Sequence, residues 1–444
     1  MDWGDRKEPS PKVGPRSHGD IDYARIVHSA SFRRLQGKTQ VFNLGDSDFY
    51  RTRLTHSVEV AQLAGSLAVQ FADQHRDTPA GALLHDRSMI QAIGYTHDLG
   101  HPPFGHGGEV ALNYCMRDNG GFEGNGQTLR ILTKLEKFSA TAGANLSRRT
   151  LLGVLKYPVP YSVAFNDELR PQLRNDVTAI RVIDRDLCKP PKCYLDTEGD
   201  AVGWILEILS QEDRDRLCTI EMQPGKHNKA RFKSLDCSIM DLADDISFGV
   251  HDIEDAIALG VLDEGDFRRY LTEDSASAFT SYLVKKYPNE YGNSAYEKWI
   301  GALYGNGDQR KHLISRMVAH LMSSAYLEDD EHFSEPLLKY RATLPDDVEI
   351  YLKSLKDCVY ERVVSAPEVQ HLEFKGQNLV VAVFEALASE PNKFLPAEAR
   401  ERIGQGDDPV RAICDHVAGM TDSYLLKIYG RLFSPGFGSV FDRL

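Results

Sequence analysis

The sequence has no run of apolar residues long enough to cross a membrane. Its first residues, MDWGDRKEPSPKVGP, are polar and rich in proline, and they lack the basic and apolar segments of a secretory leader. These two absences exclude the membrane-spanning classes. They favour a cytoplasmic, soluble protein with no membrane among its partners.

Paired cysteines are also absent. The chain has seven cysteines, an odd number, and none of them forms a CxxC pair. This usage is typical of reduced, structural thiols in a cytoplasmic protein.

Positive charge is in short supply. The 444 residues include 52 Lys and Arg against 65 Asp and Glu, which gives a net charge of −13 at pH 7. That balance disfavours a protein whose main task is to wrap nucleic acid, although local basic patches are compatible with it. An acidic protein that binds an anionic substrate must gather its cations, or a metal, in one site.

Strand signals are few, and the chain shows no repeat, low-complexity tract or clear linker. Residues 193–197 (CYLDT) and 371–377 (HLEFKGQ) are candidates for short strands or a small hairpin. Elsewhere apolar residues recur at helical spacing, with Asp20 and Thr55 as candidate caps of the first two helices. We therefore predict an all-α, multi-helix bundle forming one unit over residues 20–444, preceded by a flexible segment 1–19.

The stretch THDLGHPPFGHGGE, from Thr96 to Glu109, concentrates the residue types that perform chemistry. It holds three histidines, an aspartate and a glutamate within fourteen residues. Its two prolines force an irregular backbone, and its glycines allow that backbone to approach a ligand. If a helix starts near Gly107, His106 and Glu109 lie about one turn apart and can hydrogen-bond. The alternative is a loop capped by histidines.

Imidazoles and carboxylates on several helices are candidates for one metal site. His56, His97, Asp98 and an aspartate of MDLADDISF each lie on or at the end of a predicted helix, so a bundle can bring them together. Taken singly, each is also explained as a cap, a core residue or part of a solvated acidic face. The polar segment 38–53 adds groups able to reach a phosphate or a base edge, namely Lys38, Gln40, Arg51 and Arg53.

In this order, RLTHS, THDLGHPPFGHGGE and LADDISF resemble the H…HD…D signature of the HD-domain superfamily. The resemblance is closer to one branch, the bacterial deoxyguanosinetriphosphate triphosphohydrolase (dGTPase) group of HD dNTPases. The similar blocks run in the same order from about residue 20 to 433: RRLQGKTQVF, RTRLTHS, HDLGHPPFGHGGE, FEGNGQTLRIL, GVLKYP, DLADDISFGVHDIEDA and AGMTDSY.

The resemblance implies a role for particular residues. The implied metal ligands are His56, His97, Asp98 and Asp244, the last because the family's ligand lies four residues before an aromatic residue, here Phe248. His106 corresponds to the catalytic histidine and Glu109 to its carboxylate partner. Gly124 stands where some relatives carry a further histidine, so His106 is expected to act without that helper. The implied substrate contacts are His101, Arg53 and Lys156 beside the phosphates, Gln40 and Asp252 near the deoxyribose, and Phe248, in place of the usual tyrosine, under the sugar.

The implied reaction is hydrolysis of deoxynucleoside triphosphates, with dGTP preferred. Water attacks the α-phosphorus and releases the deoxynucleoside and inorganic triphosphate. The implied cofactor is a divalent metal ion: magnesium, manganese or another transition metal. The resemblance also implies a homo-oligomer, either a hexamer or another assembly. It implies an HD core at about 50–260 followed by a C-terminal helical part at about 261–444. Some relatives bind single-stranded DNA.

Two alternatives remain at this stage. One is an HD phosphohydrolase acting on another nucleotide, such as a nucleoside monophosphate or a cyclic dinucleotide; the block RRLQGKTQVF argues against it. The other is a nucleic-acid-binding regulator without turnover, and the complete set of expected ligands argues against that. Arg148 and Arg149 are candidate DNA contacts, but ordinary ion pairs are the simpler interpretation.

Overall fold

The computed structural model describes residues 2–10, 14–40, 51–177, 180–305, 307–436 and 438. Within these ranges the chain is mainly helical, with two small two-stranded sheets, which confirms the predicted all-α class. All seven cysteines are free, as predicted. No described helix has both the length and the apolar composition needed to cross a bilayer.

Three helices form the centre of the fold: α3 (Arg53–Gln74), α5 (Arg87–Thr96) and α12 (Leu235–Ala258). Their apolar faces contribute to one large hydrophobic cluster. The N-cap of helix α3 is Thr52, one turn before the predicted cap Thr55. The two threonines form a capping box, in which each side chain accepts a hydrogen bond from the other residue's backbone N–H, so Thr55 belongs to the first turn.

The described residues near the N-terminus make definite contacts, although no structure was expected over residues 1–19. Arg6 forms an ion pair with the buried Asp22, and the backbone N–H of Arg149 donates to the carbonyl of Trp3 over 2.9 Å. Helix α1 (His18–Val27) starts after Ser17 rather than Asp20, because these two residues form a capping box in which Asp20 occupies the third helical position.

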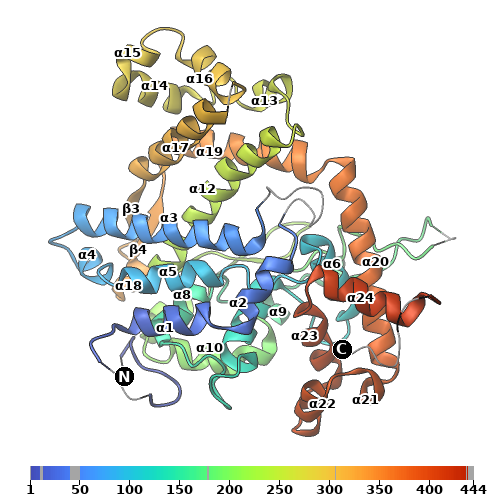
Figure 1. The fold of residues 1–444 in the computed structure, drawn as a ribbon. Helices are drawn as coiled ribbons and strands as arrows, with labels where there is room; N and C mark the ends of the chain where they lie inside the picture. Colours follow the sequence, from blue (N-terminus) through green and yellow to red (C-terminus); the bar gives the residue numbers. More distant parts are fainter. Residues whose placement is uncertain are drawn as a thin grey trace.

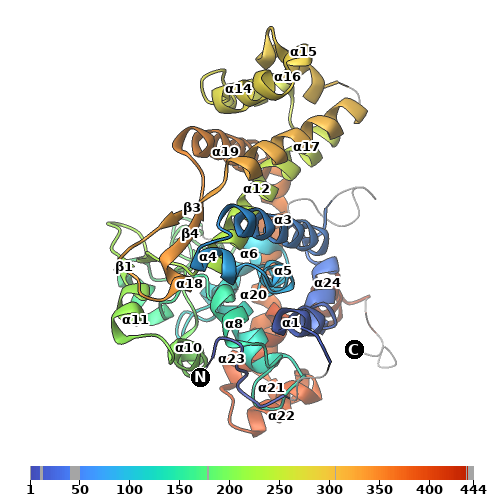
Figure 2. The ribbon, with the colours of Figure 1, turned by 90° about the vertical axis from the view of Figure 1, so that its left-hand side faces the viewer.

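Helix α12 extends from the centre into a group of helices that Figures 1 and 2 show at the top of the molecule. This group packs around buried aromatic side chains, including Phe267, Phe279 and Trp299. Its members are α13 (Glu264–Tyr270), α14 (Ser277–Lys286), α15 (Pro288–Tyr291), α16 (Ala295–Leu303), α17 (Gly307–Ser324) and α19 (Asp346–Val359).

The C-terminal helices lie against the central stretch of the sequence. Helix α20 (Pro367–Ser389) packs along α6 (Gly105–Cys115), and α23 (Pro409–Ala418) and α24 (Asp422–Phe433) complete a second hydrophobic cluster with them. A third cluster joins α1, α5 and α8 (Arg148–Val154). The far end of the chain is thus in direct contact with the segment that carries the candidate chemistry.

The described strands are not those that were predicted. Strand β1 (Ile220–Glu221) pairs with β2 (Lys229–Ala230), and β3 (Tyr326–Asp329) with β4 (Tyr340–Thr343), both antiparallel. The prediction for 371–377 is wrong, because these residues lie inside α20. The prediction for 193–197 is also wrong: apart from one isolated bridge between Tyr194 and Pro160, the segment leads into a 3₁₀ turn.

Shorter elements connect these groups. The remaining α-helices are α2 (Ala30–Arg34), α4 (Pro79–Leu83), α7 (Gly124–Arg130), α9 (Tyr161–Ala164), α10 (Gly199–Leu206), α11 (Gln211–Leu217), α18 (Pro336–Lys339), α21 (Pro391–Phe394) and α22 (Ala397–Gly404). The 3₁₀ turns are η1 (Leu35–Gly37), η3 (Asp167–Leu169) and η4 (Asp196–Glu198), and the π-helical turns are η2 (Ile131–Leu135) and η5 (Tyr360–Val364).

Candidate active site

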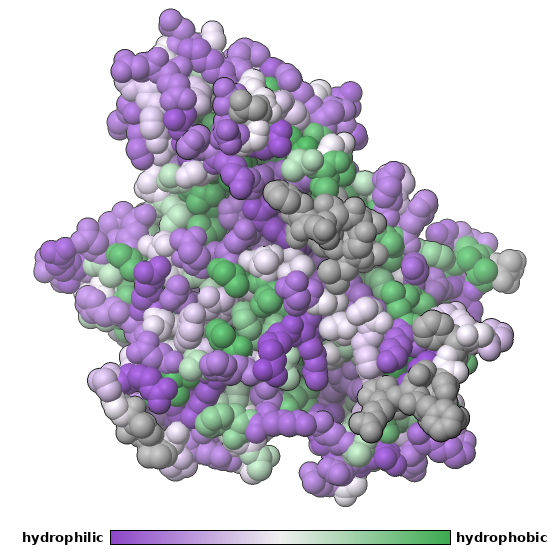
Figure 3. Space-filling view, viewed as in Figure 1, coloured by the Kyte–Doolittle hydropathy of each residue, from purple (hydrophilic) through white to green (hydrophobic). Residues whose placement is uncertain are grey.

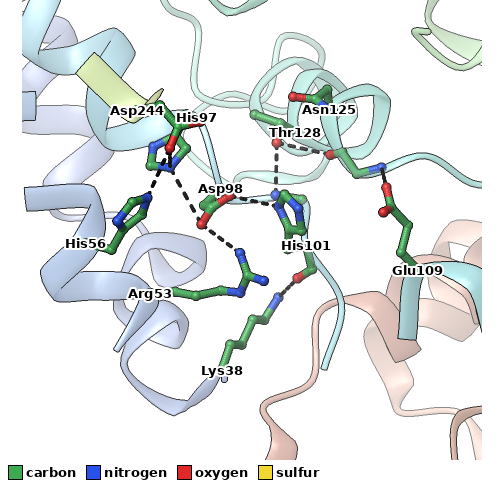
Figure 4. A network of polar contacts seen from close by, with 12 residues as sticks. Lys38, Arg53, His56, His97, Asp98, His101, Glu109, Asn125, Thr128 and Asp244 are labelled. Atoms are coloured by element: carbon green, nitrogen blue, oxygen red, sulfur yellow. Dashed lines mark hydrogen bonds and ion pairs between the residues drawn. The ribbon is translucent and has the colours of Figure 1, made fainter. Parts of the chain in front are cut away.

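The central helices bring three of the predicted metal ligands together. His56 lies in the first turn of α3, His97 is the C-cap of α5, and Asp98 follows it. One possible ligand atom from each of the three lies within 4.8 Å of the others, and all three residues are buried. Figure 4 shows their side chains pointing toward one another.

Asp244, on α12, adds a second carboxylate to the same cluster. Its Oδ1 lies 3.1 Å from Nε2 of His56 and 3.7 Å from Nε2 of His97. The segment that carries it is far away in sequence, and the packing of α12 against α3 and α5 brings it here. Figure 4 shows Asp244 beside His56 and His97. The four side chains expected to act as ligands therefore meet in one place.

The chemistry of this donor set fits a bound cation. Nδ1 of His97 lies 2.8 Å from the carbonyl oxygen of Gly94. Because a carbonyl oxygen only accepts, Nδ1 carries the hydrogen, and Nε2 of the neutral ring has a free lone pair. That Nε2 is buried, has no hydrogen-bond partner among the described residues, and faces Oδ2 of Asp98 at 3.6 Å and Oδ1 of Asp244 at 3.7 Å. A lone pair and two carboxylates repel one another unless a cation lies between them.

The electrostatics of the cluster also favour positive charge. Burial acts to lower the pKa of His56, but the carboxylate of Asp244 outweighs it and raises that pKa to about 9. Burial would raise the pKa of Asp98, yet Arg53, whose Nη1 lies 2.6 Å from Oδ2, holds it well below its usual range. Both aspartates therefore stay ionised and available as ligands, since the pKa of Asp244 is also lowered.

The irregular segment before α6 displaces His106 from the ligands. Phe104 has φ of 60°, in the left-handed region, and α6 starts directly after it. The imidazole of His106 is 61% exposed, and its Nδ1 lies 3.3 Å from Oε2 of Glu109, as the spacing predicted. The buried Glu109 also accepts a hydrogen bond from the N–H of Gly124 over 3.0 Å. The contact of Nδ1 with Glu109 thus orients the His106 ring, and Nε2 stays accessible.

The carboxylate of Glu109 stays ionised. Burial would raise its pKa, but Lys192 and His106 hold it well below its usual range. Nζ of Lys192 lies 3.6 Å from Oε1 of Glu109 and 2.9 Å from Oε1 of Glu123. Glu109 can therefore act only as an acceptor, and the proton of the His106–Glu109 hydrogen bond lies on Nδ1 of the imidazole.

The C-terminal helices hold the backbone of this segment. Asp422, the first residue of α24, accepts hydrogen bonds from the N–H of Phe104 and the N–H of Thr39, each over 2.9 Å, and from the Thr39 hydroxyl. Phe104 also packs on Gly376 of α20, where a Cβ would approach its ring to 2.5 Å. The strained left-handed turn before His106 is therefore fixed by residues about 270–320 positions away in the chain.

A cavity of about 260 Å³ is lined both by the predicted metal ligands and by His106. Cationic Arg53, Lys156 and Lys192 line it together with His106, and apolar side chains form another part of its lining. Of the predicted site residues, the cavity contacts Gln40, Arg53, His56, His97, Asp98, His101, His106, Lys156, Asp244 and Phe248. The apolar lining residues are Phe248, Val364, Val369 and Leu372.

Asp252 is the predicted substrate contact that the structure does not bring to this cavity. It lies one turn beyond Phe248 on α12, is buried, and its Oδ2 has no partner among the described residues. Burial raises its pKa to about 7. Residues 41–50, to which part of the predicted polar segment belongs, lie outside the described ranges.

Several lining residues were missed by sequence reasoning: Lys192, Asn125, Tyr157 and Glu373. Tyr157 directly follows Lys156 and could have been inferred from that position. Lys192 and Glu373 had no comparable signal, because the first lies in an irregular segment and the second in a segment predicted as a strand.

The arginine pair considered for DNA binding is engaged inside the protein. Arg149 forms an ion pair with the buried Asp236 at 2.7 Å. The guanidinium of Arg148 stacks on Trp204 at 4.1 Å, and its Nη2 lies 3.8 Å from Oε2 of Glu207. The simpler interpretation of these two arginines is therefore confirmed. They do not form an accessible basic patch.

The helical fold and the His56, His97, Asp98 cluster define an HD-domain hydrolase. Residues 53–150 match the HD domain family, and residues 342–431 match the phosphohydrolase-associated domain. The latter range includes most of the helices that hold Phe104 and Thr39, so the two matched segments meet at the candidate site.

Relatives that match over nearly the full length identify a narrower family within this class of hydrolases. The chain is 41% identical over 448 residues to a deoxyguanosinetriphosphate triphosphohydrolase-like protein of Shewanella halifaxensis, covering 99% of this chain and 98% of that protein. Proteins of the same description from Shewanella woodyi and Shewanella baltica are 42% and 41% identical, with at least 97% of each chain covered. The chain belongs to the deoxyguanosinetriphosphate triphosphohydrolase-like family, which confirms the resemblance found in its motifs.

Proposed function

We propose that this protein hydrolyses deoxynucleoside triphosphates, dGTP in preference, to the deoxynucleoside and inorganic triphosphate in a metal-dependent reaction. The observation that supports this most strongly is the single cavity shared by the four ligand side chains, three cations and His106. A triphosphate needs all three groups, because water must approach an α-phosphorus surrounded by negative oxygens.

His56, His97, Asp98 and Asp244 would hold the divalent ion. When bound, a divalent ion supplies Lewis-acid chemistry at the phosphate, since it withdraws charge from the oxygens around the phosphorus. The protein's part is to orient the ligands. Arg53 fixes Asp98, the carbonyl of Gly94 fixes the tautomer of His97, and Ser247, with Oγ 3.4 Å from Nδ1 of His56, orients that ring.

The cations of the cavity would bind the phosphate chain. Nζ of Lys156 lies 2.6 Å from Asp241 and 3.9 Å from Asp244, so it is held at the edge of the ligand cluster. Lys192 is held in the same way by Glu123 and Glu109. Their charges, with Arg53, spread stabilisation over the phosphates, while the nearby His101 ring is kept neutral because burial lowers its pKa to about 4.

His106 would move the proton that the reaction requires. Its Nδ1 is tied to the ionised Glu109, which leaves Nε2 for the substrate side. A protonated His106 can protonate the leaving 5′-oxygen, and a neutral one can accept the proton of the attacking water. The geometry is compatible with both roles, because each uses the same nitrogen.

The apolar part of the lining would hold the nucleoside. Phe248, Val369 and Leu372 suit a sugar and a base, with Gln40 near the deoxyribose. Glu373 adds a carboxylate that is 11% exposed in the same lining and is fixed by Arg185 at 2.7 Å. Guanine presents two adjacent donors, N1–H and the 2-amino group, whereas adenine and the pyrimidines do not present this pair. A fixed carboxylate therefore favours guanine.

Product analysis tests the proposal. Each dNTP is incubated with the protein and Mg²⁺ or Mn²⁺, and the products are separated by chromatography. We expect deoxyguanosine and inorganic triphosphate from dGTP in one step. Formation of dGMP and pyrophosphate, or turnover of a nucleoside monophosphate or cyclic dinucleotide instead, would contradict it.

The base preference has its own test. Glu373→Gln exchanges one acceptor oxygen for a donor, so we expect kcat/KM for dGTP to fall by about tenfold or more relative to the other dNTPs. Equal loss for all four substrates would mean that Glu373 does not contact the base. A homo-oligomer, which we also propose from the family resemblance, is measured on the same preparation by light scattering.

A further inference from the structure

A line of polar side chains runs between helices α3 and α12, from the cluster of predicted metal ligands toward the surface. On α12 its members follow Asp244 at intervals of three and four residues, so they share one face of that helix. In Figure 3, viewed as in Figure 1, hydrophilic side chains are visible at the surface where α12 passes from α3 to the upper group of helices. We call this line the polar seam, and its members are Arg51, Glu59, Ser247, His251 and Asp255.

Polar contacts connect the seam to a predicted ligand without a gap. Oγ of Ser247 lies 3.4 Å from Nδ1 of His56 and 3.2 Å from Nδ1 of His251. The same Nδ1 of His251 lies 3.1 Å from Oε2 of Glu59. Ser247 is fully buried, whereas the side chains of His251 and Glu59 are 13% and 29% exposed. The seam therefore leads outward from the ligand His56.

Ion pairs fix the outer end of the seam. Nε of Arg51 donates to both carboxylate oxygens of Glu59, over 2.9 and 3.0 Å, and Nη2 donates to Glu254 over 2.8 Å. Asp255 accepts hydrogen bonds from Nη1 of the same guanidinium and from the backbone N–H of Arg51. Burial would raise the pKa of Glu59, but His251 and Arg51 outweigh it and lower that pKa. Glu59 is therefore an ionised acceptor that is held in place.

The contacts also determine which atoms of the seam donate. An ionised Glu59 only accepts, so Nδ1 of His251 carries a hydrogen. His56 presents Nε2 to Asp244 at 3.1 Å, and when Nε2 of the neutral ring serves as the ligand atom, its Nδ1 carries the hydrogen. Both N–H groups can then donate to the oxygen of Ser247, which has two lone pairs. Ser247 thus connects the two imidazoles.

We propose that His251 is a positioning residue of the metal centre, acting through Ser247 on the imidazole of His56. Ser247 contacts the nitrogen of His56 that faces away from Asp244, and so limits rotation of the ring. The serine hydroxyl can itself rotate, and His251, tied to Glu59, keeps it in place. Partners that orient metal ligands typically change metal affinity by about 10–100-fold. The inference rests on the metal dependence proposed above.

A purely structural role for the seam makes a different prediction. The seam lies beside the large hydrophobic cluster to which both helices contribute, where polar pairs can fix the register of one helix against the other. A residue with only that role lowers the melting temperature of the metal-free protein and leaves the metal affinity of the folded protein unchanged. A positioning residue changes that affinity.

The experiment measures the dissociation constant of Mn²⁺ alone for the full-length protein, from the electron paramagnetic resonance signal of the free ion. We expect His251→Ala to weaken Mn²⁺ binding by about tenfold. His251→Asn should weaken it less, because the amide N–H₂ replaces the Nδ1–H donor. His332→Ala is the matched control, since it removes a histidine that is paired with Asp330 at 2.7 Å outside the site, and it should leave the affinity unchanged.

A double variant tests the path through Ser247. Ser247→Ala should also weaken Mn²⁺ binding by about tenfold. Adding His251→Ala to it should weaken binding by less than about twofold more, because the effects of two residues that act through one path are not additive. Unchanged affinity in His251→Ala, or fully additive losses in the double variant, overturns the proposal.

Failure of this proposal can be distinguished from failure of the proposed function. His97→Ala identifies the Mn²⁺ that binds at the ligand cluster, and melting curves of the metal-free variants check folding. A wild-type protein without Mn²⁺ binding at the cluster would overturn both the metal dependence and the role of His251. The readout contains no turnover, so a protein that binds Mn²⁺ as expected in every variant supports the role of His251 even if dGTP is not hydrolysed.

Discussion

Two groups of buried histidines in this molecule have opposite surroundings. His56 and His97 lie among carboxylates where α3, α5 and α12 meet. His320, on α17, lies among aromatic rings in the upper group of helices, with ring centroids 4.8 Å from Tyr282 and 5.6 Å from Phe279. All three histidines are buried, so burial alone does not distinguish the two groups.

The groups around each imidazole determine whether that histidine is charged. Burial lowers the pKa of His320 to about 4, and the distant Asp347 does not offset it. The same burial penalty acts on His56, but Asp244 reverses it and raises the pKa to about 9. One histidine is therefore a neutral packing residue, and the other belongs to a centre that attracts positive charge.

This difference identifies which group serves function. Buried charges are expensive, and a core that needs only stability is made as well or better from apolar groups, as around His320. A protein that keeps two aspartates, two histidines and an arginine in contact inside its core accepts that cost for a ligand. The comparison can be tested by making the same change in both groups.

The largest effect is expected from removal of a ligand. His97→Ala or Asp98→Ala should lower bound metal to background and turnover by at least about 10⁴-fold, because each removes one of the few donor atoms that converge in the cluster. Metal analysis by mass spectrometry and the dGTP assay measure both quantities.

His320→Ala is the matched control for this loss. It removes the same imidazole from a buried place and should cost about 1–3 kcal/mol of stability while metal content stays at the wild-type level. If His97→Ala retained its metal, or if His320→Ala lost it, the distinction between the two groups would be wrong.

The next effect is expected at the accessible histidine. His106→Ala should lower kcat by about 10²–10⁴-fold with metal and folding retained, since His106 contacts none of the four ligands and transfers only the proton. Glu109→Gln should show a smaller loss, because the amide still fixes the ring but no longer stabilises its charge. A folded, metal-loaded His106→Ala protein with normal kcat would refute this role.

A smaller effect is expected from the distant residue that positions this segment. Asp422→Asn leaves one acceptor oxygen for the three donors of Phe104 and Thr39, so kcat should fall by about tenfold and stability by about 1–3 kcal/mol. Asp408→Asn makes the same chemical change at the cap of α23, where asparagine also caps well, and should be nearly neutral. Equal kcat values for the two variants would mean that Asp422 does not position the catalytic segment.

Helical periodicity and residue type are local signals, and they predicted the helical class and the meeting of His56, His97 and Asp98 with an aspartate of MDLADDISF. The family resemblance singled out Asp244 as that aspartate. The sequence also predicted the His106–Glu109 contact from their spacing. The wrong strand at 371–377 has a physical cause: Leu372 and Phe374 alternate with charged residues as in a strand. Inside α20, Leu372 faces the cavity while Phe374 is exposed. Packing on α6 overrides that pattern.

Other parts of the site depend on contacts that no local pattern encodes. Asp422 reaches Phe104 across 318 positions, and Lys192 enters the cavity from an irregular segment between two short helices. The hairpin β3–β4 was missed because a helix, α18, interrupts the connection where a tight turn would have signalled it. Such contacts follow from how the helices pack.

The smallest effect is expected in the aromatic surroundings of His320, and it concerns pH. The pKa of His320 is about 4 in the folded protein and near 6.5 when the chain is unfolded. Between these values the unfolded chain binds more protons, so this group makes the free energy of unfolding fall as pH decreases from about 6.5 to 4, by at most about 3 kcal/mol. Above pH 6.5 it contributes no slope.

His320→Leu removes the titrating group and keeps an apolar side chain, so its stability should decline less than that of the wild type over this range. Urea unfolding at several pH values, followed by circular dichroism, measures the two slopes. Parallel slopes would show that His320 does not titrate with the lowered pKa, and that the contrast with His56 is smaller than the surroundings indicate.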